Sequence, residues 1–384
     1  MKIGILGGTF DPVHKAHIEI AKLALCELKL DKVIFVPNGV PPHKKESSVL
    51  CEDKLNMLKL AINPYEKFEI DNFELLKEDY SYLYITLEYF KNNYPDDELF
   101  FIAGSDNIET IPSWKNPALL FRYATFVFIK RPEYELNDKG IKKLEEDYNA
   151  KILSIDFDGI DISSSDIRCA FENCRAVGEM LPENVMEYIV NKTVYPKKLL
   201  AKLKTMIGEK RFVHSINVAK EAYRLALRYN EDADKAYYAG LLHDCAKKMD
   251  YDAQLEIIKR NNIYTIKERE LEFPKVIHAL TGAYVAKEEF GITDRIILDA
   301  IRFHTLGDVK MTLFDKIIYI ADLISEERVY KGVEILREMA YNSIDKAILT
   351  SVDNTINYVG YENIQPDIIV LRDYIKERVN GSIS

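Results

Sequence analysis

Short apolar runs alternate with amphipathic stretches over the first half of the chain. The apolar runs, each of strand length, cover residues 3–6, 33–36, 68–70, 99–103, 125–129 and 152–155. Between them, apolar residues recur at helical spacing over 18–28, 54–62, 82–92 and 141–148. Such alternation predicts a parallel sheet that is covered by helices and joined by right-handed crossovers. Ligands of these sheets bind beyond the carboxyl ends of the strands.

The pattern changes beyond residue 195. From residue 199 onward the apolar residues follow a helical period, most clearly over 211–229, 233–247, 276–290, 296–303 and 314–324. No convincing strand is predicted there. We therefore expect an α/β domain at residues 1–195 and an all-helical domain at residues 196–384, joined by a short Pro-Lys-Lys connection.

Composition narrows the class of protein. A chain of 384 residues with 47% hydrophobic and 30% charged residues is typical of a soluble protein with two domains. Its net charge of −10 argues against nucleic acid as the main partner, although a phosphorylated small molecule is still allowed. The five cysteines form no C-x-x-C pair, which favours reduced thiols and a cytoplasmic protein. No apolar run reaches the roughly 18 residues of a membrane span, and a homo-oligomer is compatible with the sequence.

The first predicted strand leads into a glycine turn. Gly7 and Gly8 are expected to end the strand, and a helical pattern begins after Pro12. A strand, a glycine turn and a helix N-terminus together present backbone N–H groups and the positive end of a helix dipole, which suits phosphate. The spacing matches neither the G-x-G-x-x-G of dinucleotide folds nor the Gly-Lys-Ser/Thr ending of a P-loop.

Two histidines follow this turn. His14 and His17 are three residues apart, so they should share one face of the first helical turn. Imidazoles beside a helix N-terminus can donate hydrogen bonds to a phosphate that becomes more negative as it reacts. A structural turn with two surface histidines is the alternative, and Thr9 and Asp11 in the same stretch weaken it.

Polar clusters also follow other predicted strands. His43 and Lys44 lie on a proline-stiffened loop and can reach a polyphosphate, although a solvated turn explains them equally well. Gly104 lets a ligand approach closely, and Asp106 can hold a hydroxyl or an amide. Trp114, the single tryptophan, either stacks on a planar ring or packs in the core.

A serine run opens the last predicted helix of the first domain. Ser163, Ser164 and Ser165 precede a helical pattern, and their hydroxyls and N–H groups can bind phosphate. Arg168 in the first turn adds a charge-assisted contact. Helix capping without a ligand is the alternative.

Together these motifs resemble nicotinate-mononucleotide adenylyltransferase. The stretches GGTFDPVHKAH, PPHK, GSD with a following Trp, KRP and ISSSDIR carry the resemblance over about residues 1–195. That family has a Rossmann-like nucleotidyltransferase fold and an H-x-G-H motif. The resemblance implies transfer of AMP from ATP to nicotinate mononucleotide, with Mg²⁺, giving deamido-NAD and pyrophosphate.

The resemblance also implies roles for individual residues. Catalysis on the ATP phosphates would fall to His14, His17, Lys44 and Arg168. The residues expected to bind ATP or the acceptor are Gly7, Gly8, Thr9, Phe10, His43, Gly104, Asp106, Trp114, Arg131, Ser163, Ser164 and Ser165. Among these, Asp106 would contact adenosine and Trp114 would stack on the nicotinate ring.

Two motifs depart from the family pattern. The glycine of the H-x-G-H motif is Ala16 here, and the family's Ser-Tyr-Thr-x-Asp-Thr-Leu run has Leu83 and Ile85 in place of Thr and Asp. Ser81 is still expected to cap the following helix. A related acceptor, such as nicotinamide mononucleotide, therefore stays open.

The second domain places histidines and aspartates in helical stretches that look buried. They are His214, His243, Asp244, His278, His304 and Asp322. A buried carboxylate costs several kcal/mol unless it is paired or bound to a cation. Six N and O ligands without cysteine suit iron, manganese, magnesium or zinc. With one bridging carboxylate they suit two metal ions about 3.5–4 Å apart, an arrangement used in phosphate-ester hydrolysis.

This pattern resembles the HD phosphohydrolase superfamily. Over about residues 199–378 it is similar to the bacterial HD-domain symmetrical diadenosine tetraphosphatases, which implies cleavage of diadenosine tetraphosphate into two ADP by two metal ions, with iron as the metal. Asp244 would bridge both ions. Lys247 and Arg328 would contact the oligophosphate or else be ordinary solvated side chains. A nucleotide-sensing module without hydrolysis is the alternative.

Overall fold

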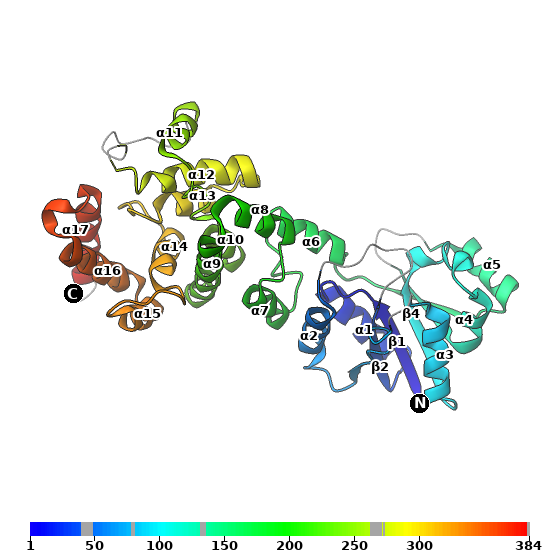
Figure 1. The fold of residues 1–384 in the computed structure, drawn as a ribbon. Coiled ribbons are helices and arrows are strands. Elements are labelled where there is room, and N and C mark those ends of the chain that lie inside the picture. The colour runs from blue at the N-terminus through cyan, green and yellow to red at the C-terminus, as the bar shows by residue number, and fades with distance from the viewer. Residues whose placement is uncertain (40–48, 78–80, 131–135, 262–270, 272, 382–384) are drawn as a thin grey trace. The chain divides into compact units, whose positions relative to one another are not determined.

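The chain forms two compact units (Figure 1). The computed structural model describes residues 1–39, 49–77, 81–130, 136–261, 271 and 273–381. One unit comprises Met1–Cys169 and Val177–Val194, and the other comprises Ala170–Ala176 and Tyr195–Ser384. The short segment Ala170–Ala176 thus clusters with the second unit, although it precedes residue 195 in the sequence.

A parallel sheet forms the centre of the first unit. Its strands are β1 (Lys2–Gly8), β2 (Lys32–Pro37), β3 (Phe68–Ile70), β4 (Glu98–Gly104), β5 (Thr125–Lys130) and β6 (Ile152–Asp156). They lie in the order β3-β2-β1-β4-β5-β6, and every neighbouring pair is parallel. The predicted parallel sheet is therefore confirmed. Its strands are apolar runs because both faces of such a sheet are covered.

Helices surround this sheet in Figure 1. They are α1 (Lys15–Glu27), α2 (Cys51–Ile62), α3 (Leu83–Asn93), α4 (Pro117–Tyr123), α5 (Asp138–Tyr148), α6 (Ser164–Glu172) and α7 (Glu183–Lys192), with short 3₁₀ helices at Ser105–Asn107 and Ile111–Ser113. Leu87 and Phe90 of α3 pack with Phe126 and Phe128 of β5 in a fully buried cluster. The apolar faces of α1 to α5 thus cover the sheet, whereas α7 packs on α2.

The glycine turn begins later than the sequence predicted. Gly7 and Gly8 continue β1, paired with Val36 and Pro37 of β2. The expectation that they end the strand was wrong, because the ladder with β2 extends through both residues. The turn proper covers residues 9–14, and α1 begins at Lys15 with His14 as its N-cap.

The second unit is helical throughout its described residues. Its α-helices are α8 (Lys197–Ile207), α9 (Glu209–Tyr229), α10 (Ala233–Leu242), α11 (Tyr251–Arg260), α12 (Ile277–Phe290), α13 (Arg295–Phe303), α14 (Leu313–Ile324), α15 (Val333–Asn342), α16 (Ile344–Val359) and α17 (Pro366–Gly381), with a 3₁₀ helix η4 (Tyr361–Asn363). The predicted all-helical second domain is confirmed for these residues. None of the described helices of either unit is long and apolar enough to cross a membrane.

Helix α10 is shorter than its apolar pattern suggested. It ends at Leu242, with His243 as the C-cap, whereas the sequence predicted a helix through residue 247. The apolar pattern persists because the following turn is also buried: Cys245 and Ala246 are at most 2% exposed. His304 similarly caps the C-terminus of α13. Two of the predicted metal ligands therefore lie at helix ends and not inside helices.

Gly240 allows α9 and α10 to pack closely. A Cβ at this position would lie 2.8 Å from Cα of Ala219 and 3.0 Å from the carbonyl oxygen of Val218. Both neighbours are backbone atoms of α9, so they cannot move aside alone. We expect Gly240→Ala to lower the free energy of unfolding by about 1–3 kcal/mol through overpacking, measured by denaturant unfolding.

Gly381→Ala is the matched control for this prediction, because a Cβ there would meet nothing within 4 Å. It should leave stability unchanged or slightly higher. Equal stability of the Gly240→Ala variant and the wild type would contradict the role of this contact.

Candidate active sites

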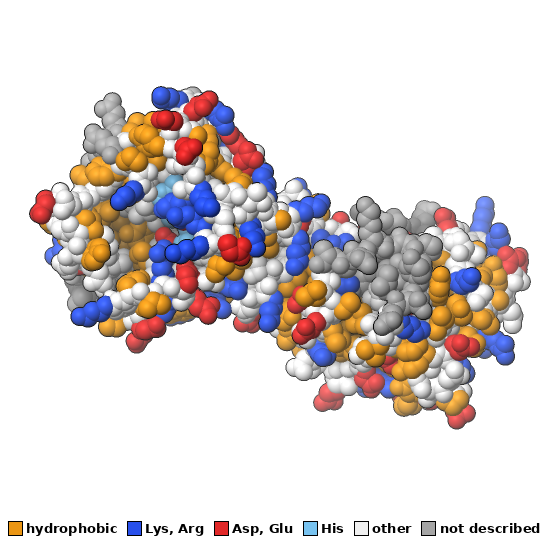
Figure 2. All heavy atoms as spheres, viewed as in Figure 1, with side chains coloured by type: hydrophobic (Ala, Val, Ile, Leu, Met, Phe, Trp, Pro, Cys, Tyr) orange, Lys and Arg blue, Asp and Glu red, His pale blue; other side chains and the backbone are white. Residues whose placement is uncertain are grey.

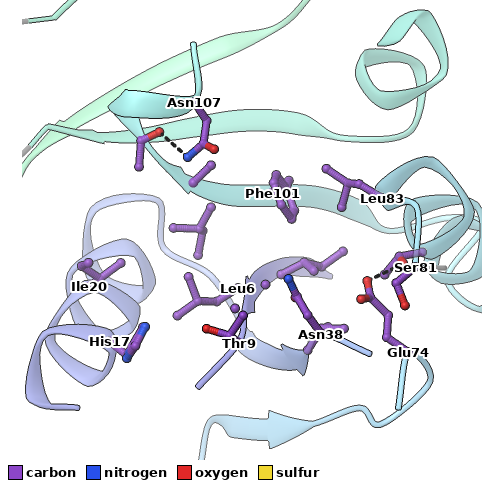
Figure 3. Close-up of a pocket in the computed structure, with 18 of the residues that line it drawn as sticks. Leu6, Thr9, His17, Ile20, Asn38, Glu74, Ser81, Leu83, Phe101 and Asn107 are labelled. Carbon is purple, nitrogen blue, oxygen red and sulfur yellow. Dashed lines mark hydrogen bonds between the residues drawn. The ribbon is translucent and has the colours of Figure 1, made fainter. Parts of the chain in front are cut away.

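A cavity of about 350 Å³ opens at the carboxyl ends of the strands in the first unit. Figure 3 shows residues from several elements that face it. They include Gly7, Gly8, Thr9, His17, Asn38, Ser81, Leu83, Phe101, Gly104, Asn107 and Trp114. The cavity lies where β1 and β4 are neighbours and the strand order changes direction, which is where ligands bind in open α/β sheets.

The first turn of α1 orients His17 toward a ligand. The backbone N–H of His14 donates to Nδ1 of His17 at 3.2 Å. The two imidazole rings lie 3.7 Å apart between centroids, and His14 is buried. Because Nδ1 accepts a hydrogen bond, the proton of the neutral His17 ring is on Nε2. His17 can therefore donate from Nε2 into the cavity that it lines.

Phe10 packs against the turn from the protein interior. It is fully buried, its ring contacts His17 edge-on at 4.9 Å, and its backbone has φ 44°. A Cβ at Gly8 would lie 3.0 Å from the Phe10 ring. The structure thus places Phe10 behind the turn, where it positions His17 and Gly8, and not on the cavity wall.

The serine run docks on the same turn. Ser163 caps α6, since its Oγ accepts from the N–H of Asp166 at 3.1 Å. Ser164 donates to the carbonyl of Pro12 at 2.9 Å. Arg168 donates to the carbonyl of Asp11 and, at 3.2 Å, to Ser165. Two motifs about 150 residues apart in sequence are therefore in direct contact, which brings the N-termini of α1 and α6 close together. The serines and Arg168 do not themselves line the cavity.

The remaining predictions for the first unit have mixed outcomes. Gly104 lines the cavity, whereas Asp106 is exposed and accepts from Nδ2 of Asn107 at 3.1 Å. Trp114 lines the cavity and also packs against the core, and its stacking on a planar ring stays a prediction. Ala16 is buried in the first turn of α1. His43, Lys44 and Arg131 lie outside the described residues.

Sequence reasoning missed a buried acid at the other end of the cavity. Glu74 is 6% exposed, lines the cavity and accepts a hydrogen bond from Thr86 at 2.6 Å (Figure 3). Burial raises the pKa of Glu74, against the hydrogen bond from Thr86. Ser81 lines this end too, but it does not cap α3 as predicted, because α3 begins at Leu83 with Tyr82 at the N-cap.

The second unit gathers the six predicted metal ligands. In the described residues, side-chain donor atoms of His214, His243 and Asp322 lie within 4.8 Å of one another, and so do those of His243, Asp244 and His304. His278 completes the set, with Nε2 3.1 Å from Oδ1 of Asp244. The residues come from α9, α12, α14 and the ends of α10 and α13.

Backbone carbonyls aim three of the imidazoles inward. Nδ1 of His243 donates to the carbonyl of Gly240 at 2.7 Å. His278 and His304 make the same bond to residues three positions earlier, at 3.0 and 2.7 Å. Each Nε2 is therefore left to face the carboxylates. This arrangement is typical of metal-ligating histidine.

The donor set fits metal ions. Nε2 of His243 is buried and has no hydrogen-bond partner among the described residues. Asp244 is 4% exposed, and its carboxylate faces His278, His304 and His243 at 3.1, 3.6 and 3.8 Å. Buried nitrogen and oxygen donors at such distances can be brought onto shared cations, which would offset the cost of burying the charge.

Side-chain cations surround these carboxylates. Arg211 donates to Oδ2 of Asp244 at 2.8 Å, and Lys247 lies 3.6 Å from Oδ1 of Asp244. Arg328 pairs with Asp322. Figure 2 shows Lys and Arg side chains gathered on a face of this unit where histidine is visible. Arg211 was not predicted as a site residue, although it lies one helical turn before His214.

The titrating groups of this site divide into two kinds. Burial lowers the pKa of His243 and of His278 to about 4, against the attraction of Asp244. Burial also opposes the charge of Asp244, but the imidazoles around it hold its pKa well below the usual range. Burial alone would lower the pKa of His214, yet its hydrogen bonds to Asp322 and Glu327 raise it to about 9.

Two family models match the chain. A cytidylyltransferase-like model matches residues 5–170, and an HD domain model matches residues 211–327. These matches define the class: a nucleotidyltransferase-type α/β domain followed by an HD domain. An HD domain implies binding of divalent metal, in agreement with the ligand groups of the second unit.

Known relatives extend these matches. A Mycoplasma genitalium protein, named a probable nicotinate-nucleotide adenylyltransferase/Ap4A hydrolase, is 33% identical over 93% of this chain and 99% of its own length. A probable nicotinate-nucleotide adenylyltransferase of Clostridium tetani is 37% identical over 50% of this chain and 98% of its own. The chain belongs to the two-domain family of nicotinate-nucleotide adenylyltransferase/Ap4A hydrolases.

A solved structure resembles part of the chain. A protein from Clostridium acetobutylicum, described as a predicted HD superfamily hydrolase involved in NAD metabolism, is 41% identical over 47% of this chain and 97% of its own, with a TM-score of 0.45.

The raised pKa of His214 leads to a prediction about metal loading. At pH 7 His214 is a cation in the metal-free protein, because its pKa is about 9. A metal ion can bind its Nε2 only after that proton leaves, whereas His243 and His278 are already neutral. We expect Mn²⁺ binding at pH 7 to release about one proton. The association constant for Mn²⁺ should therefore rise about tenfold per pH unit up to pH 9.

Calorimetric titrations in two buffers of different ionisation enthalpy measure this proton. His214→Gln should abolish the buffer dependence of the heat. Equal heats for the wild-type protein in both buffers would show that His214 is neutral before the metal binds.

Proposed function

We propose that the chain is a bifunctional enzyme. Residues 1–195 transfer AMP from ATP to nicotinate mononucleotide, and residues 196–384 hydrolyse diadenosine tetraphosphate to two ADP. The cavity of the first unit, the group of possible metal ligands in the second unit and the names of the family's members support this assignment. The five cysteines form no C-x-x-C pair, which agrees with action in the cytoplasm.

The transferase proposal rests on the convergence of two helix N-termini. The first turns of α1 and α6 meet through the bonds of Ser164 and Arg168 to the turn at residues 11–12. Their N–H groups and Arg168 supply positive potential for the triphosphate of MgATP. His17 donates from Nε2 to the phosphate under attack. Direct attack of the acceptor phosphate on the α-phosphorus needs alignment and charge neutralisation but no protein nucleophile.

The other end of the cavity suits the acceptor. Trp114 and Phe101 offer ring faces for the pyridine, and α3 begins at Leu83 on the cavity wall. The first N–H groups of a helix favour a carboxylate, which nicotinate carries and nicotinamide lacks. Glu74 at the same end is the feature that would favour the amide, so both acceptors need to be compared.

Pyrophosphate release with each mononucleotide tests the acceptor. We expect a higher kcat/KM with nicotinate mononucleotide than with nicotinamide mononucleotide, because the α3 N-terminus attracts the carboxylate. A clear preference for nicotinamide mononucleotide would contradict the proposal and would point to Glu74 as the residue that selects the amide.

Loss of the His17 imidazole should slow adenylyl transfer. We expect His17→Ala to lower kcat by about 10²–10³-fold, which is typical of losing one preorganised donor to a developing anion. The hydrolysis of diadenosine tetraphosphate by the same variant serves as the control and should be unchanged. An unchanged kcat for transfer would exclude His17 from the reaction.

The hydrolase proposal rests on the position of Asp244. Its two carboxylate oxygens face different imidazoles: Oδ1 faces His278 and His304, and Oδ2 faces His243. This carboxylate can therefore serve two ions, for which we propose iron, with His214, His243 and Asp322 on one side and His278 and His304 on the other. Two bound ions supply an activated water for phosphate-ester hydrolysis.

Three cations are placed to hold the oligophosphate. Arg211, Lys247 and Arg328 each contact a carboxylate of the ligand set and are 29–39% exposed at the side chain. They can therefore reach both the buried centre and a bound substrate. Arginine and lysine of this kind orient phosphates and offset their charge.

The Asp244→Asn variant tests the hydrolase and its alternative together. We expect the rate of hydrolysis to fall by more than about 100-fold, while adenylyl transfer is retained. Losing a residue that only supports a metal ligand typically costs about 10–100-fold, and Asp244 is proposed as a ligand itself. Asp252→Asn, at an exposed position of α11, is the control for the loss of one charge. If the iron-loaded or manganese-loaded wild-type protein does not release ADP from diadenosine tetraphosphate, the second domain is a nucleotide-sensing module.

A further inference from the structure

His214 differs from the other three histidines of the metal centre in the partner of its Nδ1. His243, His278 and His304 donate to backbone carbonyls of their own helices or turns. His214 donates instead to a carboxylate, that of Glu327, which lies beyond the end of α14. The four imidazoles are therefore supported by three neutral acceptors and one anionic acceptor.

Glu327 is itself held in place. Its Oε2 accepts from Nδ2 of Asn217 at 2.7 Å, and its Oε1 accepts from the hydroxyl of Ser325 at 2.8 Å. Asn217 is one turn after His214 on α9, and Ser325 is fully buried. Two donors from different elements thus fix the carboxylate against the ring, and their arrangement leaves His214 Nε2 facing Asp322 at 3.0 Å.

An anionic acceptor changes the ligand and not only its orientation. A carboxylate that accepts the Nδ1–H of imidazole increases the electron density on Nε2, so the ring becomes a stronger donor to a metal ion. A backbone carbonyl fixes the ring in the same way but adds no charge. An ion held by His214, His243 and Asp322 would therefore have the carboxylate of Glu327 behind one of its imidazole ligands, which an ion held by Asp244, His278 and His304 would lack. Side-chain cations contact the carboxylates of both positions, so they do not by themselves make the positions differ.

We infer that Glu327 is a positioning residue that makes the two metal positions unequal, with the His214 position the tighter one. This inference rests on the metal centre of the proposed hydrolase and assigns its order of loading. The first divalent ion binds beside His214, and the second binds beside His278 and His304. At a limiting metal supply the protein then carries one ion and lacks the pair.

Titration of the metal-free protein with Co²⁺ at pH 9, where the proton on His214 no longer opposes binding as it does at pH 7, measures both affinities in competition with a chromophoric chelator. The visible spectrum of Co²⁺ reports the ligands of each ion. His214→Gln and His304→Gln each remove a ligand from one position and so identify which affinity belongs to which position. We expect Glu327→Gln to weaken the tighter position by about 10–100-fold and to leave the weaker one unchanged.

Glu326→Gln is the matched control, because it removes the same charge from an exposed neighbour. It should alter neither affinity. Equal weakening of both positions by Glu327→Gln, weakening of the His304 position alone, or the same effect from Glu326→Gln would each overturn the inference.

Asn217→Ala is a second variant that still tests the inference if Glu327→Gln does not fold. It removes one donor from Glu327 without touching a metal ligand, and it should weaken the tighter position by less than Glu327→Gln does. Unchanged affinities in Asn217→Ala would overturn the inference even if Glu327→Gln unfolds, which circular dichroism detects.

The titration is independent of turnover. A wild-type protein that binds two ions unequally but releases no ADP from diadenosine tetraphosphate refutes the hydrolase and leaves the role of Glu327 standing. A wild-type protein that binds both ions with equal affinity refutes the role of Glu327 and leaves the hydrolase standing.

Discussion

The carboxylate of Asp244 is nearly inaccessible to water, and the structure of the second unit depends on how that charge is satisfied. Burying a lone carboxylate costs several kcal/mol, so the surrounding helices must bring compensating groups to it. His243 comes from the end of α10, His278 from α12 and His304 from the end of α13, while Arg211 and Lys247 add positive charge. The helices that pack around Asp244 are therefore also the elements that supply the histidines and cations facing its carboxylate.

The first unit solves a related problem with backbone groups. The positive ends of the helix dipoles at the starts of α1 and α6 favour anions, and the bonds of Ser164 and Arg168 to the turn at residues 11–12 bring these two helix ends together. No buried charge is needed in the protein itself, because the substrate carries the charge. The two units thus use different physics for phosphate: fixed dipoles in one, and a cluster of ligands for cations in the other.

Particular residues show how far sequence reasoning reaches. The six predicted metal ligands were chosen as unexpected polar residues in apolar helical patterns, and their side chains do come together. The ends of α10 and β1 were misplaced for opposite reasons. Burial of the turn after Leu242 carries the apolar pattern beyond the end of α10, whereas pairing of Gly7 and Gly8 with β2 carries β1 beyond its apolar pattern. Glu74, Arg211 and Glu327 were missed as site residues, since an isolated charged residue in a polar stretch gives no periodic signal.

The sequence by itself determined the two fold classes, the order of the strands and helices along the chain, and the residue types able to bind phosphate and metal. These depend on local periodicity and composition, which each segment carries on its own. Only the tertiary structure decided which side chains meet. Phe10 lies behind the turn, and Ser164 donates to the carbonyl of Pro12. Among the four histidines of the second unit's predicted metal centre, only His214 has its Nδ1 bonded to a carboxylate. Such contacts join residues that are far apart in sequence, and their geometry depends on the packing of whole elements.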